Sequence, residues 1–566
     1  MATPQQIDEQ IKLERLQISQ GIEQLRKNTN QLEHKQYASA TVYGITSIDT
    51  LLPLVIKEIE DTSIRIKKGQ NGRSFKEINK YLKHLEPLAA ATIALKITFD
   101  KVFTTKKGSN QLSTICESIG RAIEDELQMR HYENKAPGLL QTLKKNYWHR
   151  SIGTKQKIVV IQTLMNRYNV ESWKSWAPTN RVKLGAWLLE CIINTSKWFF
   201  KGVQVEGRNK TVHYIYPTPE FLEIKDQVIK DSEMFAPLAW PMLIEPNDWT
   251  EENQGGYILN EVMRGYPMVR RSNHHPIQGE LPYRFLNKIQ KVGFKINLFT
   301  FNVAEWLECK GRSVDKFIPI LDLPLPPKPI DIADNKDSRK AYRRSAAEVM
   351  NKNANAFRRS CRTRMTMDAA RRFRWHSRWF IPWSFDYRGR AYPIPAFLTP
   401  QDTDFGKSLI RFADEAPMTP EAEDWLAFQV ATTYGLDKST MGERLKWTKD
   451  NITLISRIAQ DPYRNVSDWE GAEEPWQFLA ACDEYYNCVI TNTRQTTGLY
   501  VACDATCSGL QILAGLARDK STAQLVNVLP SDRPQDAYKV VAQHARAKCP
   551  ESIRKVMDRK VVKEPS

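Results

Sequence analysis

Residues 499–511 read Leu-Tyr-Val-Ala-Cys-Asp-Ala-Thr-Cys-Ser-Gly-Leu-Gln and contain the sharpest chemical signal in the chain. The apolar run at 499–503 predicts a buried strand. A helix is predicted directly after it, with core spacing at Leu510, Leu513, Ala514 and Ala517. Asp504 would then stand at the end of a core strand, where a carboxylate is a good ligand for Mg²⁺. The alternative is that Asp504 only caps the following helix.

A second charged group lies near the end of the chain, at Arg559-Lys560-Val561-Val562-Lys563. Arg559 and Lys563 are four residues apart, so they would share one face of a helix. Two cations placed in this way could hold a triphosphate and stabilise pyrophosphate as it leaves. A solvated basic segment is the alternative interpretation of the same spacing.

Composition points to a polyanionic partner, and the alternative is a basic but otherwise ordinary soluble protein. The 566 residues include 82 Lys+Arg and 65 Asp+Glu, which gives a formal charge of +17. Such an excess favours nucleic acid, whose phosphates attract Lys and Arg. Hydrophobic residues make up 41% of the chain, which excludes a wholly disordered protein. No apolar stretch reaches the roughly 20 residues that span a bilayer, and none of the nine cysteines forms a CxxC motif.

The positive charge is concentrated after a proline-rich connector at 319–330. Between Lys336 and Arg378, arginines recur in steps of three or four, which predicts one or two helices with basic faces. This set includes Arg358 and Arg362. The next segment, Asp386-Tyr387-Arg388-Gly389-Arg390-Ala391-Tyr392, joins arginines and aromatics around a glycine. It suits contact with nucleic acid, or else Asp386 forms a structural ion pair with Arg388 or Arg390.

The first 318 residues are predicted to be mainly helical. Apolar residues at helical spacing give 5–35 a single stripe, at Ile7, Ile11, Ile18, Ile22 and Leu25. A helix at 47–66 ends in the basic turn 67–73, with Lys67, Lys68 and Arg73. The turn is either a solvated connection or a loop that presents cations to a DNA groove. The β-rich runs 202–206 and 211–216 flank Gly-Arg-Asn-Lys and predict a hairpin.

Together these segments resemble the phage-type, single-subunit DNA-dependent RNA polymerases, which include the mitochondrial enzymes. The motifs that carry the resemblance are 118–126 (Ser-Ile-Gly-Arg-Ala-Ile-Glu-Asp-Glu), 255–257 (Gly-Gly-Tyr), 386–390 and 504–511. The resemblance implies that Asp504 is one of two metal-binding aspartates, that the carbonyl of Ala505 adds a ligand, and that two Mg²⁺ ions are the cofactors. It also implies nucleotide contacts at Lys563, Arg559 and Tyr538.

The same resemblance places the other segments on nucleic acid. It implies that Arg388, Arg390 and Tyr392 lie near the template and hybrid. The basic turn 67–73 resembles a reader of AT-rich upstream DNA, and the hairpin resembles one that opens the promoter. The partners implied are double-stranded promoter DNA, a template strand, nascent RNA and NTPs, with no membrane. The location implied is the cytoplasm of a bacterium infected by the phage that encodes the protein.

The expected fold is α+β, predominantly α, with the right-hand polymerase architecture. We expect a promoter-binding domain at 1–318, a basic thumb-like segment with its connector at 319–380, and a partial palm with the start of the fingers at 381–566. The family's second metal aspartate would lie beyond Ser566. We therefore expect a truncated polymerase or one half of a split enzyme, completed by a separate C-terminal fragment and nearly inactive alone.

Two departures and two rival functions remain. The family usually has Gly at the position of Ala505 and His at the position of Ile512.

Related DNA polymerases have Glu five residues after the metal aspartate, where Gly509 here leaves room for a ribose 2′-OH. This favours an RNA polymerase over a DNA polymerase-like enzyme. The other rival is a non-catalytic nucleic-acid-binding protein.

Overall fold

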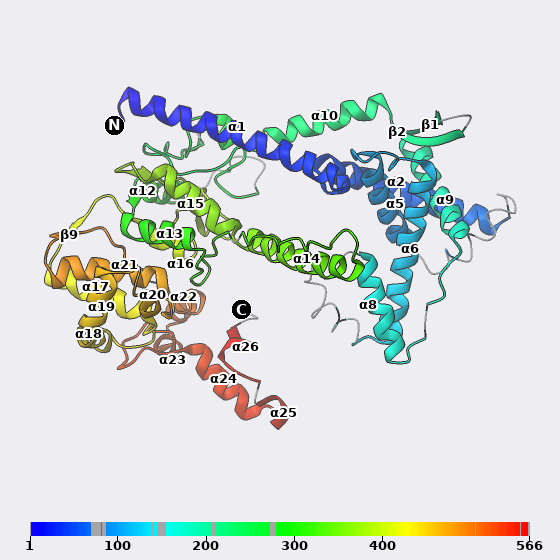
Figure 1. The fold of residues 1–566 in the computed structure, drawn as a ribbon. Helices are drawn as coiled ribbons and strands as arrows, with labels where there is room; N and C mark the ends of the chain where they lie inside the picture. The colour runs from blue at the N-terminus through cyan, green and yellow to red at the C-terminus, as the bar shows by residue number, and fades with distance from the viewer. Residues whose placement is uncertain are drawn as a thin grey trace. The chain divides into compact units, whose positions relative to one another are not determined.

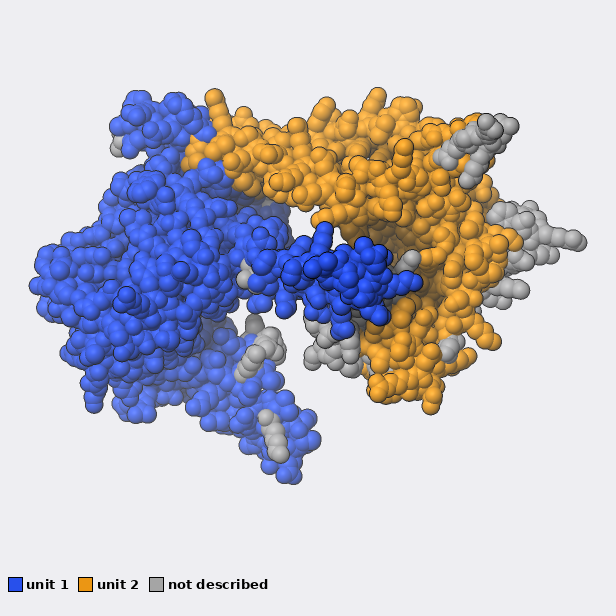
Figure 2. Space-filling model, in the orientation of Figure 1, with its two compact units in different colours: residues 1–12, 239–258, 266–566 blue, residues 13–238, 259–265 orange. Residues whose placement is uncertain are grey.

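The computed structural model describes residues 2–69, 78, 81, 86–138, 141, 143, 154–171, 173–206, 210–252, 254–271, 279–320, 322–503, 505–554 and 556–563. Helices dominate, and the strands are short (Figure 1). An α+β fold that is predominantly α is therefore confirmed. The chain forms two compact units (Figure 2): unit 1 comprises 1–12, 239–258 and 266–566, and unit 2 comprises 13–238 and 259–265. The domain limits expected at 318 and 380 stay a prediction.

Unit 2 is a helical body with one hairpin. Its helices begin with most of α1 (Pro4–His34), the short 3₁₀ helix η1 (Ala38–Ala40) and α2 (Val42–Lys67). Then follow α5 (Pro87–Val102), α6 (Leu112–Lys135), α8 (Thr154–Arg167), α9 (Pro178–Ser196), α10 (Pro219–Glu233) and α11 (Asn260–Met263). The predicted hairpin is confirmed as β1 (Phe199–Glu206) paired antiparallel with β2 (Lys210–Pro217). Its turn at 207–209 lies outside the described residues.

The 118–126 motif packs α6 against α9. A Cβ added at Gly120 would lie 2.1 Å from the backbone oxygen of Arg181, so only glycine permits this approach. One turn further along α6, the buried carboxylate of Glu124 pairs with Arg181. It also accepts hydrogen bonds from the backbone N–H of Trp176 (2.6 Å) and from Trp173 Nε1 (3.2 Å). The motif thus holds helices and a loop together inside unit 2.

The buried face of α1 is polar. Gln10, Glu14 and Gln17 are fully buried, whereas the predicted stripe from Ile7 to Leu25 is exposed or half-buried. The reason lies in the irregular segments beside the helix, whose backbone N–H groups need acceptors. Gln10 Oε1 accepts from Leu243 N, and Glu14 Oε2 accepts from Leu259 N, both at 2.7 Å.

Unit 1 contains the remaining elements. Its first helices are α12 (Glu280–Ile289), α13 (Leu298–Lys310), α14 (Lys336–Arg359), α15 (Cys361–Phe373) and α16 (Asp404–Ser408). The later ones are α17 (Pro420–Tyr434), α18 (Met441–Asp450), α19 (Ile452–Gln460), α20 (Val466–Trp469) and α21 (Pro475–Tyr485), which continues into the π-helical turn η2 (Tyr486–Ile490). The last are α22 (Ser508–Ala517), α23 (Lys520–Leu525), α24 (Ala537–Lys548), α25 (Glu551–Arg554) and α26 (Arg559–Lys563).

Among the described residues of unit 1, the strands form three small antiparallel sheets. The largest has the order β4 (Trp379–Phe380), β3 (Gly293–Ile296), β7 (Ile410–Phe412). The others pair β5 (Trp383–Phe385) with β6 (Ala391–Pro393), and β8 (Ala416–Pro417) with β9 (Thr496–Thr497). Buried aromatic side chains of unit 1 also pack together: the ring centroid of Trp476 lies 5.0 Å from that of Phe317 and 4.7 Å from that of Phe405. This core fixes α16 and α21 beside each other.

The basic segment forms the two helices α14 and α15, and the described part of the connector 319–330 has neither helix nor strand. No helix in the described part of the chain is long and apolar enough to cross a membrane.

The buried strand predicted at 499–503 is wrong. These residues have no strand assignment, and Ala502 and Cys503 are exposed. A strand needs a neighbour to satisfy its backbone groups, and no described residue forms a ladder with 499–503. The helix predicted after it is confirmed as α22, but Ala514 alone of the predicted core positions is buried, while Leu510 and Leu513 are 39% and 60% exposed.

Candidate functional site

The turn that follows position 504 is held by polar contacts. Asp504 itself lies outside the described residues. Thr506 Oγ1 donates a hydrogen bond to the backbone oxygen of Val526 (3.2 Å), and Gln511 Nε2 donates to the same oxygen (2.8 Å). These bonds join the start of α22 to the segment that leaves α23.

Asn527 joins that segment to the loop before α24. Its amide Nδ2 donates to the backbone oxygen of Gln535 (2.9 Å), and its Oδ1 accepts from Gln535 N (2.7 Å). Its φ of 61° is in the left-handed region, which Asn tolerates better than most residues. Sequence reasoning missed Asn527, because its only local signal is an Asn just after a helix, which is common.

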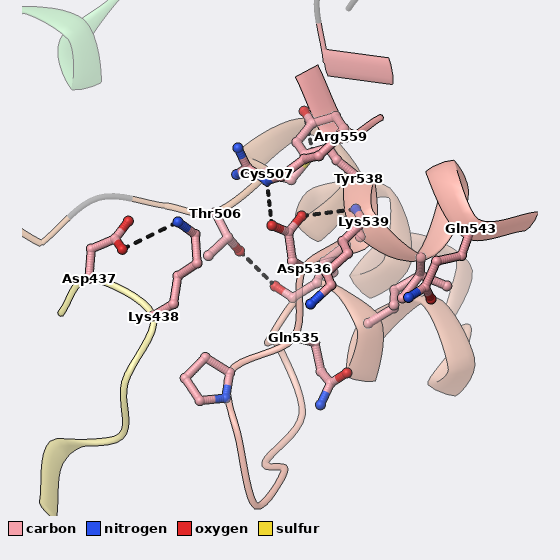
Figure 3. A pocket seen from close by; sticks show the side chains of 15 residues that line it. Asp437, Lys438, Thr506, Cys507, Gln535, Asp536, Tyr538, Lys539, Gln543 and Arg559 are labelled. Atoms are coloured by element: carbon pink, nitrogen blue, oxygen red, sulfur yellow. Dashed lines mark hydrogen bonds and ion pairs between the residues drawn. The ribbon is translucent and has the colours of Figure 1, made fainter. Parts of the chain in front are cut away.

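These contacts shape a pocket of about 440 Å³ in unit 1 (Figure 3). Its walls come from the turn after α17, from the turn before α22, from the end of α23, from α24 with its preceding loop, and from α26. The lining residues are Asp437, Lys438, Thr506, Cys507, Leu525, Val526, Pro534, Gln535, Asp536, Ala537, Tyr538, Lys539, Val540, Gln543 and Arg559. The structure therefore brings the 504–511 motif together with Tyr538 and Arg559.

Tyr538 lies in the first turn of α24 and faces the motif. Its Oη is 3.4 Å from the Sγ of Cys507, and both side chains are half-buried. The phenol ring thus forms part of the pocket wall beside the turn after position 504 (Figure 3).

Arg559 reaches the pocket from α26 and pairs with Asp536. Asp536 also caps α24, because its Oδ1 accepts from Lys539 N (3.2 Å). Burial opposes ionisation of Asp536, but the Arg559 guanidinium and the N–H groups of the helix outweigh it and hold its pKa below the usual value. A bound anion would therefore compete with Asp536 for Arg559.

Two more predicted residues lie close along the chain but line no part of this pocket. Lys563 is exposed at the end of α26, four residues after Arg559. Gly509 is in the first turn of α22, and a Cβ added there would meet no heavy atom within 4 Å. Position 509 thus has the open space that the sequence argument requires.

The pocket contains two lysines that sequence reasoning missed. Lys438 comes from the turn between α17 and α18 and pairs with Asp437 (3.3 Å), while Lys539 follows Tyr538 on α24. Lys438 is nearly 70 residues from the motif along the chain, so no local pattern could connect it to the site. With Arg559 they bring three cations to the pocket against the two carboxylates of Asp437 and Asp536, so the lining keeps a positive excess that suits a polyanion.

Within the described residues, no group of three or more His, Cys, Asp or Glu side chains could hold a metal ion. Position 504 lies outside them, so this result does not test Asp504. Ala505, whose carbonyl is the second predicted ligand, is exposed.

The 386–392 segment comprises the loop of the β5–β6 hairpin (386–390) and the start of β6, and Asp386 organises the loop. Asp386 Oδ1 accepts from the backbone N–H groups of Arg388 and Arg390, both at 2.9 Å, and its Oδ2 pairs with the guanidinium of Arg388 (2.9 Å). The structural ion pair considered from the sequence is thus present. Arg390 is exposed and forms no ion pair among the described residues. The guanidinium carbon of Arg270 lies 4.9 Å from the ring centroid of Tyr392.

The other predicted nucleic-acid contacts are spread over both units. In unit 1, Arg358 is exposed at the end of α14 and Arg362 pairs with Asp402. In unit 2, Lys67 and Lys68 are exposed at the end of α2, while Arg73 lies outside the described residues.

Comparisons with known proteins identify the same polymerase family that the sequence motifs resemble. A family model described as "DNA-directed RNA polymerase N-terminal" matches residues 9–278, and one described as "DNA-dependent RNA polymerase" matches 416–565. The second match contains the whole pocket.

Several curated relatives are polymerases. The chain is 27% identical to T7 RNA polymerase of Escherichia phage T7 over 527 residues, which cover 88% of this chain and 57% of the relative. It is 26% identical to the DNA-directed RNA polymerase of Enterobacteria phage T3, covering 87% and 57%. It is 27% identical to the mitochondrial DNA-directed RNA polymerase of Neurospora crassa, covering 88% and 37%. The chain thus spans little more than half the length of these phage relatives, and it belongs to the family of phage-type single-subunit RNA polymerases.

Proposed function

We propose that the protein carries out DNA-directed synthesis of RNA from NTPs, and that the pocket beside Tyr538 receives the incoming nucleotide. The observation that supports this proposal best is that Thr506 and Cys507 of the 504–511 motif line one cavity with Tyr538 and Arg559. Lys438 and Lys539 add positive charge to the same walls. A cluster of fixed cations suits a triphosphate and the pyrophosphate that leaves it.

In this proposal the 3′-OH of the RNA attacks the α-phosphorus of a paired NTP. The new bond joins O3′ to phosphorus, the proton of the 3′-OH passes to solvent, and the bond to pyrophosphate breaks. Arg559, assisted by Lys563 from the same helix, steadies the phosphates. To do so, Arg559 must exchange part of its contact with Asp536 for a phosphate oxygen.

Asp504 and the backbone carbonyl of Ala505 would hold Mg²⁺. The donor types fit, because Mg²⁺ takes oxygen ligands and keeps part of its shell as water and substrate phosphate. The exposure of Ala505 leaves room for that shell. When bound, two such ions activate the attacking oxygen and stabilise the leaving one. Gly509 leaves space for the ribose 2′-OH, which favours NTPs over dNTPs.

The remaining partners follow from the family. We propose a right-hand architecture in which the hairpin β1–β2 and the turn at 67–73 contact double-stranded promoter DNA. Arg388, Arg390 and Tyr392 would contact the template and hybrid, and Arg358 and Arg362 of the thumb-like segment would contact nucleic acid beside the nascent RNA. The relatives from phages support a phage-encoded protein that acts in the bacterial cytoplasm. A separate C-terminal fragment stays a prediction.

The test is ATP binding in the presence of Mg²⁺. Arg559→Ala should weaken ATP binding about 10- to 100-fold, because hydrogen bonds to a charged group contribute about 1.5–3 kcal/mol. Arg554→Ala is the matched control, since Arg554 lies on α25, bonds the backbone oxygen of Cys549 and does not line the pocket. Equal ATP affinity in the two variants would contradict the assignment of the pocket.

A further inference from the structure

A second cavity in unit 1, of about 350 Å³, lies beside the start of α15 and shares no residue with the nucleotide pocket. We call it the α15 cavity. It is lined by Asp315, Lys316, Ile318, Arg359, Arg362, Thr363, Thr366, Thr403 and Phe405. The proposed nucleotide chemistry does not use it, and of its lining residues only Arg362 is among the proposed nucleic-acid contacts.

The α15 cavity carries an excess of positive charge. Three cations line it against the single carboxylate of Asp315. Lys316 and Arg359 are exposed and form no ion pair among the described residues. Arg362 is held in place by the buried Asp402, with Nε 3.1 Å from Oδ1, and by the ring of Phe397, whose centroid lies 5.4 Å from its guanidinium carbon. Lys316 and Arg359 thus face only the carboxylate of Asp315, beside a third cation that Asp402 holds, so the cavity keeps a positive excess.

The wall of the α15 cavity also contains a buried hydroxyl without a partner. Thr366 is 1% exposed, and its Oγ1 has no hydrogen-bond partner among the described residues. A helical threonine usually donates to the carbonyl one turn earlier, but Thr366 does not. Its neighbour Thr363 is satisfied, because its hydroxyl accepts from Ile318 N (3.0 Å) and donates to Lys316 O (3.3 Å). Buried polar groups are normally hydrogen-bonded, so an unpaired hydroxyl in a cavity wall indicates a ligand with an acceptor atom.

We propose that the α15 cavity binds a phosphate group. A phosphate offers several acceptor oxygens at once, one for the Thr366 hydroxyl and others for the planar fork of Arg359 and for Lys316. The source is either a phosphodiester of a nucleic-acid strand or a free phosphate. A phosphodiester ligand from a nucleic-acid strand rests on the proposed function, whereas the phosphate site itself does not.

The decisive variant is Thr366→Val, which keeps the shape of the side chain and removes the hydroxyl. We expect inorganic phosphate, measured by calorimetric titration, to bind about 3- to 10-fold more weakly, by analogy with the loss of one hydrogen bond. The melting temperature without phosphate should be unchanged or higher, because an unpaired buried hydroxyl is lost. A purely structural threonine would give the opposite result, a lower melting temperature with unchanged phosphate affinity.

Arg359→Ala tests the charge, with Arg343→Ala as its control. Arg343 is exposed on the same helix, roughly 24 Å away at 1.5 Å per residue. We expect Arg359→Ala to weaken phosphate binding and Arg343→Ala to leave it unchanged. Phosphate affinity that is equal in Thr366→Val, Arg359→Ala and the unmodified protein would overturn the proposal.

A single-stranded oligonucleotide then identifies the source. If a strand phosphate is the ligand, Thr366→Val weakens oligonucleotide binding, and Arg359→Ala lowers the slope of log affinity against log salt by about 0.7. If only inorganic phosphate binding changes, the site takes free phosphate. No NTP is needed in either titration, so failure here is distinguishable from failure of the nucleotide pocket, which Arg559→Ala reports.

Discussion

Asp404 is a half-buried residue whose carboxylate caps a helix other than its own. Its oxygens accept from the backbone N–H groups of Trp476 (2.9 Å) and Gln477 (3.1 Å) at the start of α21, and from Gln477 Nε2 (3.0 Å). Burial raises the pKa of Asp404 to about 6, although these donors act in the opposite direction. The folded state therefore binds this proton more tightly than the unfolded state does. The resulting stabilisation is complete below about pH 4 and is lost as the pH rises through 6.

Asp404→Asn should remove this pH dependence. A shift of about two pKa units corresponds to roughly 3 kcal/mol, so the unmodified protein should lose up to that much stability between pH 4 and pH 7 through this group. The asparagine variant should be less stable at pH 4.5 and should show a flatter profile. Urea unfolding midpoints of both proteins at several pH values measure the difference. Parallel profiles would show that Asp404 does not titrate in this range.

The loop at 526–536, between α23 and α24, depends on Asn527 for its position beside α22. Asn527→Ala removes both hydrogen bonds to Gln535 and places a less tolerant residue at a φ of 61°. We expect about 1–3 kcal/mol of destabilisation and weaker ATP binding, because Tyr538 and Asp536 follow directly.

Asn527→Gly separates the two causes, since glycine keeps the left-handed backbone but not the hydrogen bonds. Thermal unfolding and ATP titration of the two variants give the comparison. Full ATP affinity in Asn527→Gly would mean that the loop before α24 needs no support from this side chain.

Helices and the hairpin are the elements that the sequence could predict, because periodic apolar residues and the Gly-Arg-Asn-Lys segment at 207–210 are local signals. The same signals failed at 499–503, where an apolar run has no neighbouring strand among the described residues. They also failed on α1, where Gln10 and Glu14 are buried to serve backbone donors far along the chain. In the pocket, Tyr538 and Arg559 were predicted by resemblance. Lys438 and Asn527 were not, because only the folded chain brings them to the site.

At the level of the entire protein, its formal charge of +17 and the exposed arginines of α14 predict DNA binding dominated by phosphate contacts. Counterion release makes such binding steep in salt, so a protein with 6–10 phosphate contacts loses about 10³- to 10⁵-fold in affinity between 50 and 200 mM salt. Fluorescence anisotropy with a labelled duplex at several salt concentrations measures this. A nearly flat salt dependence would contradict the proposed nucleic-acid partner.

Asp504→Asn separates binding from catalysis, because it removes one carboxylate that is proposed to hold Mg²⁺ and leaves the basic surfaces unchanged. The variant should keep its DNA affinity and its salt dependence. It should lose the gain in ATP affinity that Mg²⁺ gives over EDTA, and any templated ribonucleotide incorporation that the unmodified protein shows. A non-catalytic nucleic-acid-binding protein would be indifferent to the substitution in all of these measurements. Indifference would therefore favour that function over the polymerase, whereas a selective loss of the Mg²⁺-dependent signals supports nucleotide chemistry at position 504.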